Sequence, residues 1–212
     1  MSWHSFSFGA HYDPANVGFG RLVCHNVDDL GPGAGYALHP HRDLEIVTWV
    51  IEGELHHRDS AGSTSVVQAG QAQYLGAGSG VRHQEYAGDT RTRFAQMWVT
   101  PDESGLPPAY ARTDLGSADS EGWVALAGGL GDSGGLLPTR TRNASLHARQ
   151  LRNGDRATLD AAPFLHLYVC TGVVKLEGAG QATQLHAGDA VRATDQGITL
   201  EGEGQVLAWV MQ

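Results

Sequence analysis

The chain has 212 residues and a formal net charge of −9 at neutral pH, and its 29 glycines are nearly twice the usual share of about 7%. Apolar residues make up 41% of the sequence, which is enough for one large or two small cores and excludes disorder as the main state. The acidic balance, without clustered lysines or arginines, argues against direct binding of DNA or RNA. No apolar run approaches the roughly 20 residues of a membrane span, and the amino terminus lacks a signal-peptide pattern, so we expect a cytoplasmic protein.

Short segments rich in branched and aromatic residues alternate with turn-forming residues along the chain. They occupy residues 45–52, 65–67, 72–75, 93–100, 164–170 and 206–211. This pattern is typical of an all-β barrel or sandwich. No long stretch keeps the period of a helix, so any helix is expected to be a single turn. Cys24 and Cys170 form no CxxC pair and are predicted to be small core residues.

A segment rich in proline, glycine and serine, residues 101–122, divides the chain into two halves with the same order of motifs. In the first half VIEGEL is followed by VVQAGQAQYL and AQMWV, and in the second LYVCTGVVKL is followed by QLHAGDAV and VLAWV. This repetition predicts two copies of one β-barrel. We therefore expect a first barrel at residues 1–105, a connection at 106–122 and a second barrel at 123–212.

Histidines gather in the first half with a spacing that predicts metal ligands. His39 and His41 lie two residues apart where a predicted strand opens, and His83 and Glu85 have the same spacing after a glycine-rich turn. Residues two apart on a strand point to the same face, so neighbouring strands would aim three imidazoles and one carboxylate at one point. This set suits Fe(II), Mn, Co or Ni, and it lacks the thiolates of a closed zinc site. Either pair alone would more often be incidental, and their joint occurrence favours a metal site.

The same stretches resemble the cupin signature motifs. GAGYALHPHRDLE, residues 33–45, is similar to the first motif, and residues 70–83 are similar to the second, with Gly78 where cupins usually carry proline. Within the cupins, HPHRDLEIVTWVIEGELHHRDSAG, AGSGVRHQE and QMWVTP resemble pirins. WHSFSFGAHYDP and GFGRL resemble the short bacterial pirin-like branch of that family.

The resemblance to pirins implies a bicupin, two antiparallel β-barrels with a metal site in the first barrel only. It assigns the ligands to His39, His41, His83 and Glu85 and favours iron, with Mn, Co, Ni, Cu and Zn as alternatives. It also implies quercetin 2,3-dioxygenase activity on a flavonol or a similar enolic aromatic with O₂. In that reaction Glu85 would accept the proton of the substrate hydroxyl. The alternative is a redox-sensitive regulatory protein that binds a protein partner without turnover through the same four ligands.

Four other polar residues near these motifs receive separate predictions. Glu45 shares the strand parity of the first histidine pair, and we expect it to accept a hydrogen bond beside the metal or at the barrel rim rather than to bind the ion. His56 and His57 are adjacent, so they must point to opposite faces, and both are predicted to be surface or rim residues. His25 is predicted to be a core or surface histidine, with a pocket-lining position as the alternative.

Aromatic residues and the second half complete the expectations. Trp49 and Trp98 are predicted to be barrel core, with Gln96 and Trp98 as an alternative substrate wall. The second half carries no histidine at the positions that match the two ligand pairs. Those positions hold Thr158, Asp160, Glu201 and Glu203. We therefore assign the second half a structural or partner-binding role.

Overall fold

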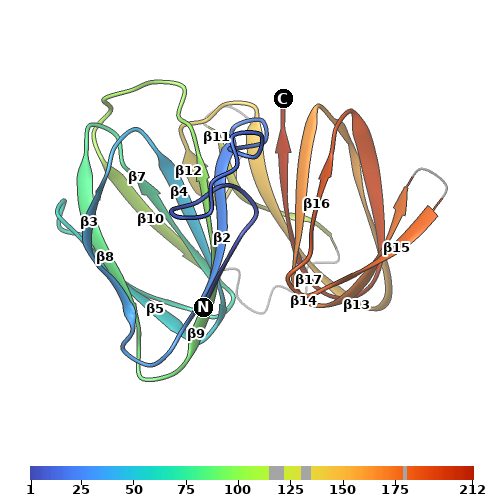
Figure 1. The fold of residues 1–212 in the computed structure, drawn as a ribbon, viewed down its shortest axis with the longest axis horizontal. Helices are drawn as coiled ribbons and strands as arrows, with labels where there is room; N and C mark the ends of the chain where they lie inside the picture. The colour runs from blue at the N-terminus through green and yellow to red at the C-terminus, as the bar shows by residue number, and fades with distance from the viewer. Residues whose placement is uncertain (115–121, 130–134, 179–180) are drawn as a thin grey trace. The chain divides into compact units, whose positions relative to one another are not determined.

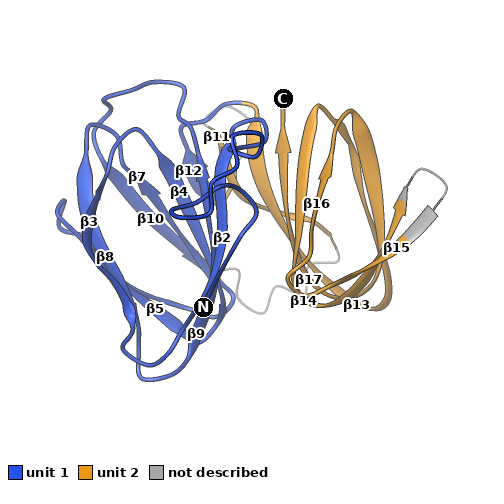
Figure 2. Cartoon of the chain, in the orientation of Figure 1, with its two compact units in different colours: residues 1–117, 137–142 blue, residues 118–136, 143–212 orange. Residues whose placement is uncertain are grey.

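A computed structural model describes the chain except residues 115–121, 130–134 and 179–180 (Figure 1). The described residues form antiparallel β-strands and contain no helix, which confirms the predicted all-β fold. Within these ranges there is accordingly no helix with the length and hydropathy to cross a membrane. The chain clusters into two compact units, Met1–Ser117 with Leu137–Arg142, and Ala118–Leu136 with Asn143–Gln212 (Figure 2).

The first unit contains a six-stranded sheet. Its order is β1 (Ser2–His4), β2 (Leu22–Leu30), β9 (Thr92–Val99), β4 (Glu45–Glu52), β7 (Gln71–Gly76) and β10 (Ala109–Asp114). Strand β10 lies within the segment that was expected to connect the halves, and it pairs with β7 from Ala109↔Gly76 onward. Its half-exposed, mixed sequence AYARTD has the composition of a loop, so only the pairing with β7 makes it a strand.

A four-stranded sheet in the same unit carries the predicted ligands. Its order is β3 (Gly35–His41), β8 (Val81–Ala87), β5 (Glu54–Asp59) and β6 (Thr64–Gln68). Gly53, at φ +76°, makes the tight turn from β4 in the first sheet to β5 in this one. A Cβ atom at Gly35 would lie 2.2 Å from the carbonyl oxygen of Glu85, so glycine allows β3 to approach β8 closely. The two strands that carry the predicted ligands are neighbours, with His39 paired to His83.

The interior of the first unit combines apolar clusters with buried polar side chains. One cluster contains Ile46, Leu75, Ala77 and Val81, and another contains Val50, Leu55, Val67 and Phe94. Trp49 and Cys24 are buried, as predicted. Buried polar residues of the same unit include Asp28, Thr48, His57, Gln73, His83 and Glu85. Burying a polar group costs folding free energy unless the group has a hydrogen-bond or ionic partner. A group of such residues in one place is therefore a candidate functional site.

The second unit is built on three long strands. β13 (Ala144–Ala162), β17 (Gln196–Met211) and β14 (Phe164–Gly178) are neighbours, with β11 (Val124–Gly129) on β13 and with β15 (Gln181–His186) and β16 (Ala190–Ala193) on β14. The short strand β12 (Leu137–Thr139) clusters with the first unit. Gly172 and Gly188 adopt positive φ values like Gly53 and Gly70 in the first half. The repeated glycine turns that were noted in the sequence therefore share a backbone conformation.

Candidate metal centre

Three imidazoles converge between β3 and β8. The ring centroid of His39 lies 4.4 Å from that of His83, and the His41 centroid lies 4.9 Å from each of the other two. One ring nitrogen from each residue lies within 4.8 Å of the corresponding nitrogens of the other two. The structure thus brings these three predicted ligands to one point.

A β-bulge in β3 controls which side chains face this point. Tyr36 pairs with Glu85 and His39 pairs with His83, so β3 has one residue more than β8 between the two pairs. An extra residue reverses the alternation of side chains along the strand. As a result Tyr36, His39 and His41 all line the same cavity. Without the bulge, Tyr36 and His39 would point to opposite faces, because they lie three residues apart in the strand.

The free ring nitrogens of the cluster fit a metal ion. Nδ1 of His39 lies 2.8 Å from the carbonyl oxygen of Ala37, and because a carbonyl only accepts, the proton is on Nδ1 and the lone pair of Nε2 is available. Nε2 of His41 and both ring nitrogens of His83 are buried, and among the described residues they have no hydrogen-bond partner. Buried polar atoms are normally satisfied, so unpaired nitrogens that face one another have the chemistry to bind a cation.

Burial also sets the protonation of these rings. It lowers the pKa of His41 to about 4, assisted by the neighbouring His39. It likewise lowers the pKa of His83 to about 4, with Glu85 opposing the shift. Both rings are therefore neutral at pH 7, which is the form that binds metals.

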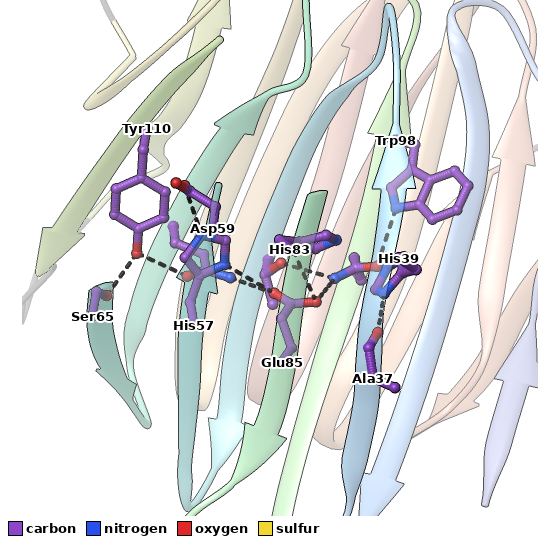
Figure 3. Close-up of polar contacts among 12 residues, drawn as sticks. Ala37, His39, His57, Asp59, Ser65, His83, Glu85, Trp98 and Tyr110 are labelled. Atoms are coloured by element: carbon purple, nitrogen blue, oxygen red, sulfur yellow. Dashed lines mark hydrogen bonds and ion pairs between the residues drawn. The ribbon is translucent and has the colours of Figure 1, made fainter. Parts of the chain in front are cut away.

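Glu85 is held as a carboxylate by two amide groups. Nε2 of Gln73 donates to Oε1 at 2.6 Å, and Nε2 of Gln96 donates to Oε2 at 2.8 Å. Burial alone would raise the pKa of Glu85, but the neighbouring imidazoles of His57 and His83 and the Gln96 amide together lower it below its usual value. Figure 3 shows Glu85 between His57 on one side and the His83 and His39 rings on the other.

The carboxylate belongs to a second group of potential ligands. Its oxygen atom Oε2 lies 4.0 Å from Nδ1 of His83, and Glu85, His83 and His57 form a group whose ligand atoms lie within 4.8 Å of one another. His83 is shared with the cluster of three imidazoles. The four predicted ligands thus lie in two overlapping groups, and His57 was not among the four.

The prediction for His57 is wrong. The side chain is buried, with Nε2 at 3.1 Å from Oδ2 of Asp59, Nδ1 at 3.8 Å from Oε1 of Glu85 and its ring stacked on Tyr110 at 4.7 Å. His56 points to the other face and is partly exposed, as predicted. The signal was available in the sequence, because Leu55 is apolar and buried, and residues two and four positions later share its inward face.

Glu45 behaves as expected for a carboxylate that does not bind a metal. Its Oε2 accepts a hydrogen bond from the Tyr74 hydroxyl at 2.6 Å and one from the backbone N–H of Arg140 at 2.6 Å. Burial raises the pKa of Glu45, and the two hydrogen bonds oppose this shift. Neither group of potential ligands found among the described residues includes it. Glu45 therefore ties the segment Leu137–Arg142 to β4 of the first unit.

The imidazoles open into a cavity of about 300 Å³ with aromatic walls. Phe8 meets Trp98 edge to face at 5.7 Å, and Trp98 meets His41 at 5.0 Å. The indole N–H of Trp98 donates to Oε1 of Gln96 at 3.1 Å. Gln96 and Trp98 both line the cavity, and Trp98 also packs against the apolar cluster that contains Ile46 and Leu75. His25 is buried, but it is not among the residues of the cavity wall.

In the described part of the second unit no residue belongs to either group of potential ligands. The four positions that match the ligand pairs lie on the long strands. Thr158 and Asp160 are on β13, and Glu201 and Glu203 are on β17. His166 is buried on β14, and burial lowers its pKa to about 3.

Comparisons with known proteins agree on one family. The pirin family model matches residues 1–99. A Mycobacterium tuberculosis protein that is provisionally named a quercetin 2,3-dioxygenase is 44% identical over 220 residues, covering 99% of this chain and 87% of its own length. Escherichia coli quercetin 2,3-dioxygenase is 44% identical over 111 residues, covering 51% of this chain and 48% of its own length.

A solved structure of the bacterial pirin YhhW from Escherichia coli, in complex with nickel(II), is similar over the whole fold. It is 30% identical, has a TM-score of 0.87 and covers 99% of this chain and 90% of its own length. The all-β architecture and the histidine cluster define this chain as a bicupin. It belongs to the pirin family, which confirms the resemblance noted in the sequence.

Proposed function

We propose that this protein is a metal-dependent dioxygenase that cleaves a flavonol or a similar enolic aromatic with O₂. The observation that carries the proposal is the cluster of imidazoles with unpaired nitrogens, two of which, His39 and His41, line an aromatic-walled cavity. The proposed ligands are His39, His41, His83 and Glu85. The quercetin 2,3-dioxygenase names of two relatives support the substrate class.

The donor set favours a divalent ion of intermediate hardness. We propose Fe(II) as the native metal, with Mn, Co, Ni, Cu and Zn as alternatives, because three imidazoles and one carboxylate accommodate all of them. The nickel(II) bound to YhhW supports a site of this breadth. The ion would supply Lewis acidity toward the enolic oxygens of a substrate.

The protein side chains would orient the substrate and take up its proton. Phe8 and Trp98 offer flat apolar surfaces against which an aromatic ring can pack. Glu85 would accept the hydroxyl proton at a carboxylate oxygen, since its lowered pKa keeps it ionised before substrate arrives. The amides of Gln73 and Gln96 hold the carboxylate in place for this transfer.

We also propose that the two halves are separate cupin domains. Residues 1–105 would form the metal-binding domain, and residues 123–212 would serve structure or the binding of a protein partner. The two compact units support a division into two domains, although their boundaries differ from these, since β10 and Leu137–Arg142 cluster with the first unit.

Oxygen uptake and loss of quercetin absorbance test the proposal. We expect protein loaded with Fe(II) to consume O₂ and quercetin together, at a rate proportional to bound iron and well above that of free iron. The metal series Mn, Co, Ni, Cu and Zn, measured per bound ion, would identify the ions that support turnover. Full iron occupancy without oxygen uptake would refute dioxygenase activity on this substrate and favour the alternative of a regulatory protein, which a pull-down with and without iron would test.

A further inference from the structure

Asp28 is a buried carboxylate in the wall of the cavity. It lies on β2, in the six-stranded sheet, and only 5% of the residue is exposed. Its Oδ1 atom is buried and has no hydrogen-bond partner among the described residues. The residue lines the same cavity as His39 and His41, which come from the four-stranded sheet. A ligand in this cavity therefore meets histidines from one sheet and Asp28 from the other.

The neighbours of Asp28 leave that oxygen free. Asn26, two residues earlier on the same face, accepts a hydrogen bond at Oδ1 from His4 Nδ1 at 2.7 Å, and its amide nitrogen is not a partner of Asp28 Oδ1. Burial raises the pKa of the Tyr36 phenol, and a hydrogen bond to Asp28 raises it further. One phenol cannot satisfy both carboxylate oxygens, which offer about four acceptor positions.

An unpaired buried carboxylate oxygen is costly to keep. Folding removes its water, and nothing among the described residues replaces that water. Asp29, the next residue, faces the other way and has the guanidinium of Arg91 as its partner. Such an uncompensated acceptor in a ligand cavity is explained most simply if the ligand brings the donor.

We propose that Asp28 accepts a hydrogen bond from a hydroxyl group of the substrate other than the enolic oxygens that meet the metal. The substrate class is then an aromatic compound with two features, an enolic oxygen pair for the metal and a second phenolic hydroxyl for Asp28. This orientation rests on the proposed function. Asp28 is a specificity-determining residue in this proposal and takes no part in proton transfer at the reacting carbon atoms.

Two flavonols separate these two features. Quercetin has the 3-hydroxyl and 4-carbonyl pair together with further phenolic hydroxyls, whereas 3-hydroxyflavone has the pair alone. Binding is measured without oxygen on zinc-loaded protein, because Zn²⁺ has no redox chemistry, and quenching of tryptophan fluorescence reports the dissociation constant. We expect wild-type protein to prefer quercetin by about 10- to 100-fold, the effect of one hydrogen bond to a charged acceptor.

Substitution of Asp28 should remove this preference. Asp28→Leu keeps the branching and the number of heavy atoms of the side chain but has no acceptor, so we expect the two dissociation constants to agree within about threefold. Asp28→Asn keeps one oxygen acceptor and should show an intermediate preference. Asp29→Asn, on the opposite face of the same strand, is the matched control and should retain the wild-type ratio.

Thermal unfolding separates a ligand-binding role from a structural one. If Asp28 is kept for a ligand, Asp28→Asn should raise the unfolding temperature of the ligand-free protein, because it keeps one acceptor for Tyr36 and removes the buried carboxylate oxygen that has no partner among the described residues. A lower unfolding temperature for Asp28→Asn would indicate a structural role and overturn the proposal.

Two binding results would also overturn the proposal for Asp28. One is a wild-type ratio of the two dissociation constants in folded Asp28→Leu, and the other is no binding of either flavonol by wild-type protein. If the protein takes up no oxygen but still prefers quercetin in a way that depends on Asp28, the dioxygenase proposal alone is refuted and this inference stands. Turnover of quercetin together with a wild-type ratio of dissociation constants in Asp28→Leu would refute this inference and leave the dioxygenase proposal standing.

Discussion

The two units use similar turns and similar strands, but they fill their interiors differently. A large cluster of apolar side chains lies in the second unit. It consists of Leu151, Ala157, Leu165, Leu167, Val169, Val174, Leu185, Ile198, Leu200, Val206 and Ala208. The first unit has smaller apolar clusters beside a group of buried imidazoles, carboxylates and amides.

This difference shows that one strand pattern supports either a stable core or a chemical site. Apolar burial stabilises by about 25 cal/mol per Å² of surface removed from water, whereas buried polar groups stabilise only when each is satisfied. The unpaired nitrogens of His83 and the unpaired oxygen of Asp28 therefore cost stability in the first unit. We expect the first unit to depend on a metal ion for part of its stability.

The largest expected effect is the loss of the metal from the first unit. In a His39→Ala, His83→Ala double variant we expect bound metal to fall from about one ion per chain to background, because two of the three clustered imidazoles are gone. His186→Ala, an exposed histidine of the second unit, is the control and should keep its metal. Elemental analysis measures both, and unchanged metal in the double variant would disprove the proposed ligands.

The next effect distinguishes the two buried glutamates. Glu85→Gln should lower the turnover per bound iron by about 10² to 10⁴, the usual contribution of a positioned proton acceptor. An amide is a poorer ligand for a divalent cation, so the rate is normalised to iron content. Glu45→Gln, which alters a carboxylate bonded to Tyr74 and Arg140, should leave that rate unchanged. Full turnover of Glu85→Gln per iron would show that the proton acceptor is another group.

The adjacent histidines of β5 provide a smaller contrast. His57→Leu leaves the carboxylates of Asp59 and Glu85 buried without their shared imidazole, and it should lower the free energy of unfolding by about 3 to 5 kcal/mol. His56→Leu changes a partly exposed ring on the other face and should have an effect below about 0.5 kcal/mol. Urea unfolding of the metal-loaded protein measures both, and equal effects would contradict the buried position of His57.

The smallest effect concerns the second unit and depends on pH. Burial lowers the pKa of His166 from 6.5 to about 3, so between these values the unfolded chain binds a proton that the folded chain does not. Stability is therefore lost as the pH falls below 6.5, by about 2 kcal/mol at pH 5. His166→Phe should remove this loss, while the exposed His186→Phe should not. Urea midpoints at pH 8 and pH 5 give the comparison, and an unchanged pH dependence in His166→Phe would contradict the prediction.

Local pattern was sufficient for several strands and for the pairs of candidate ligands. A run of branched and aromatic residues placed β4 at residues 45–52, where the structure has it. Because side chains two apart share a face in any strand, the pairs at His39 and His41 and at His83 and Glu85 were recognisable without knowledge of the fold. The glycine turns at Gly53 and Gly172 were likewise visible, since a positive φ favours glycine.

The tertiary structure alone decided which other residues join the site. The bulge in β3 turns Tyr36 toward the same cavity as His39, and the pairing of β5 with β8 places His57 opposite Glu85. The position of Asp28 in the cavity wall depends on the packing of one sheet over the other. Strand alternation is a local property, but strand register, bulges and sheet packing join residues that are distant in sequence, and no short-range pattern determines them.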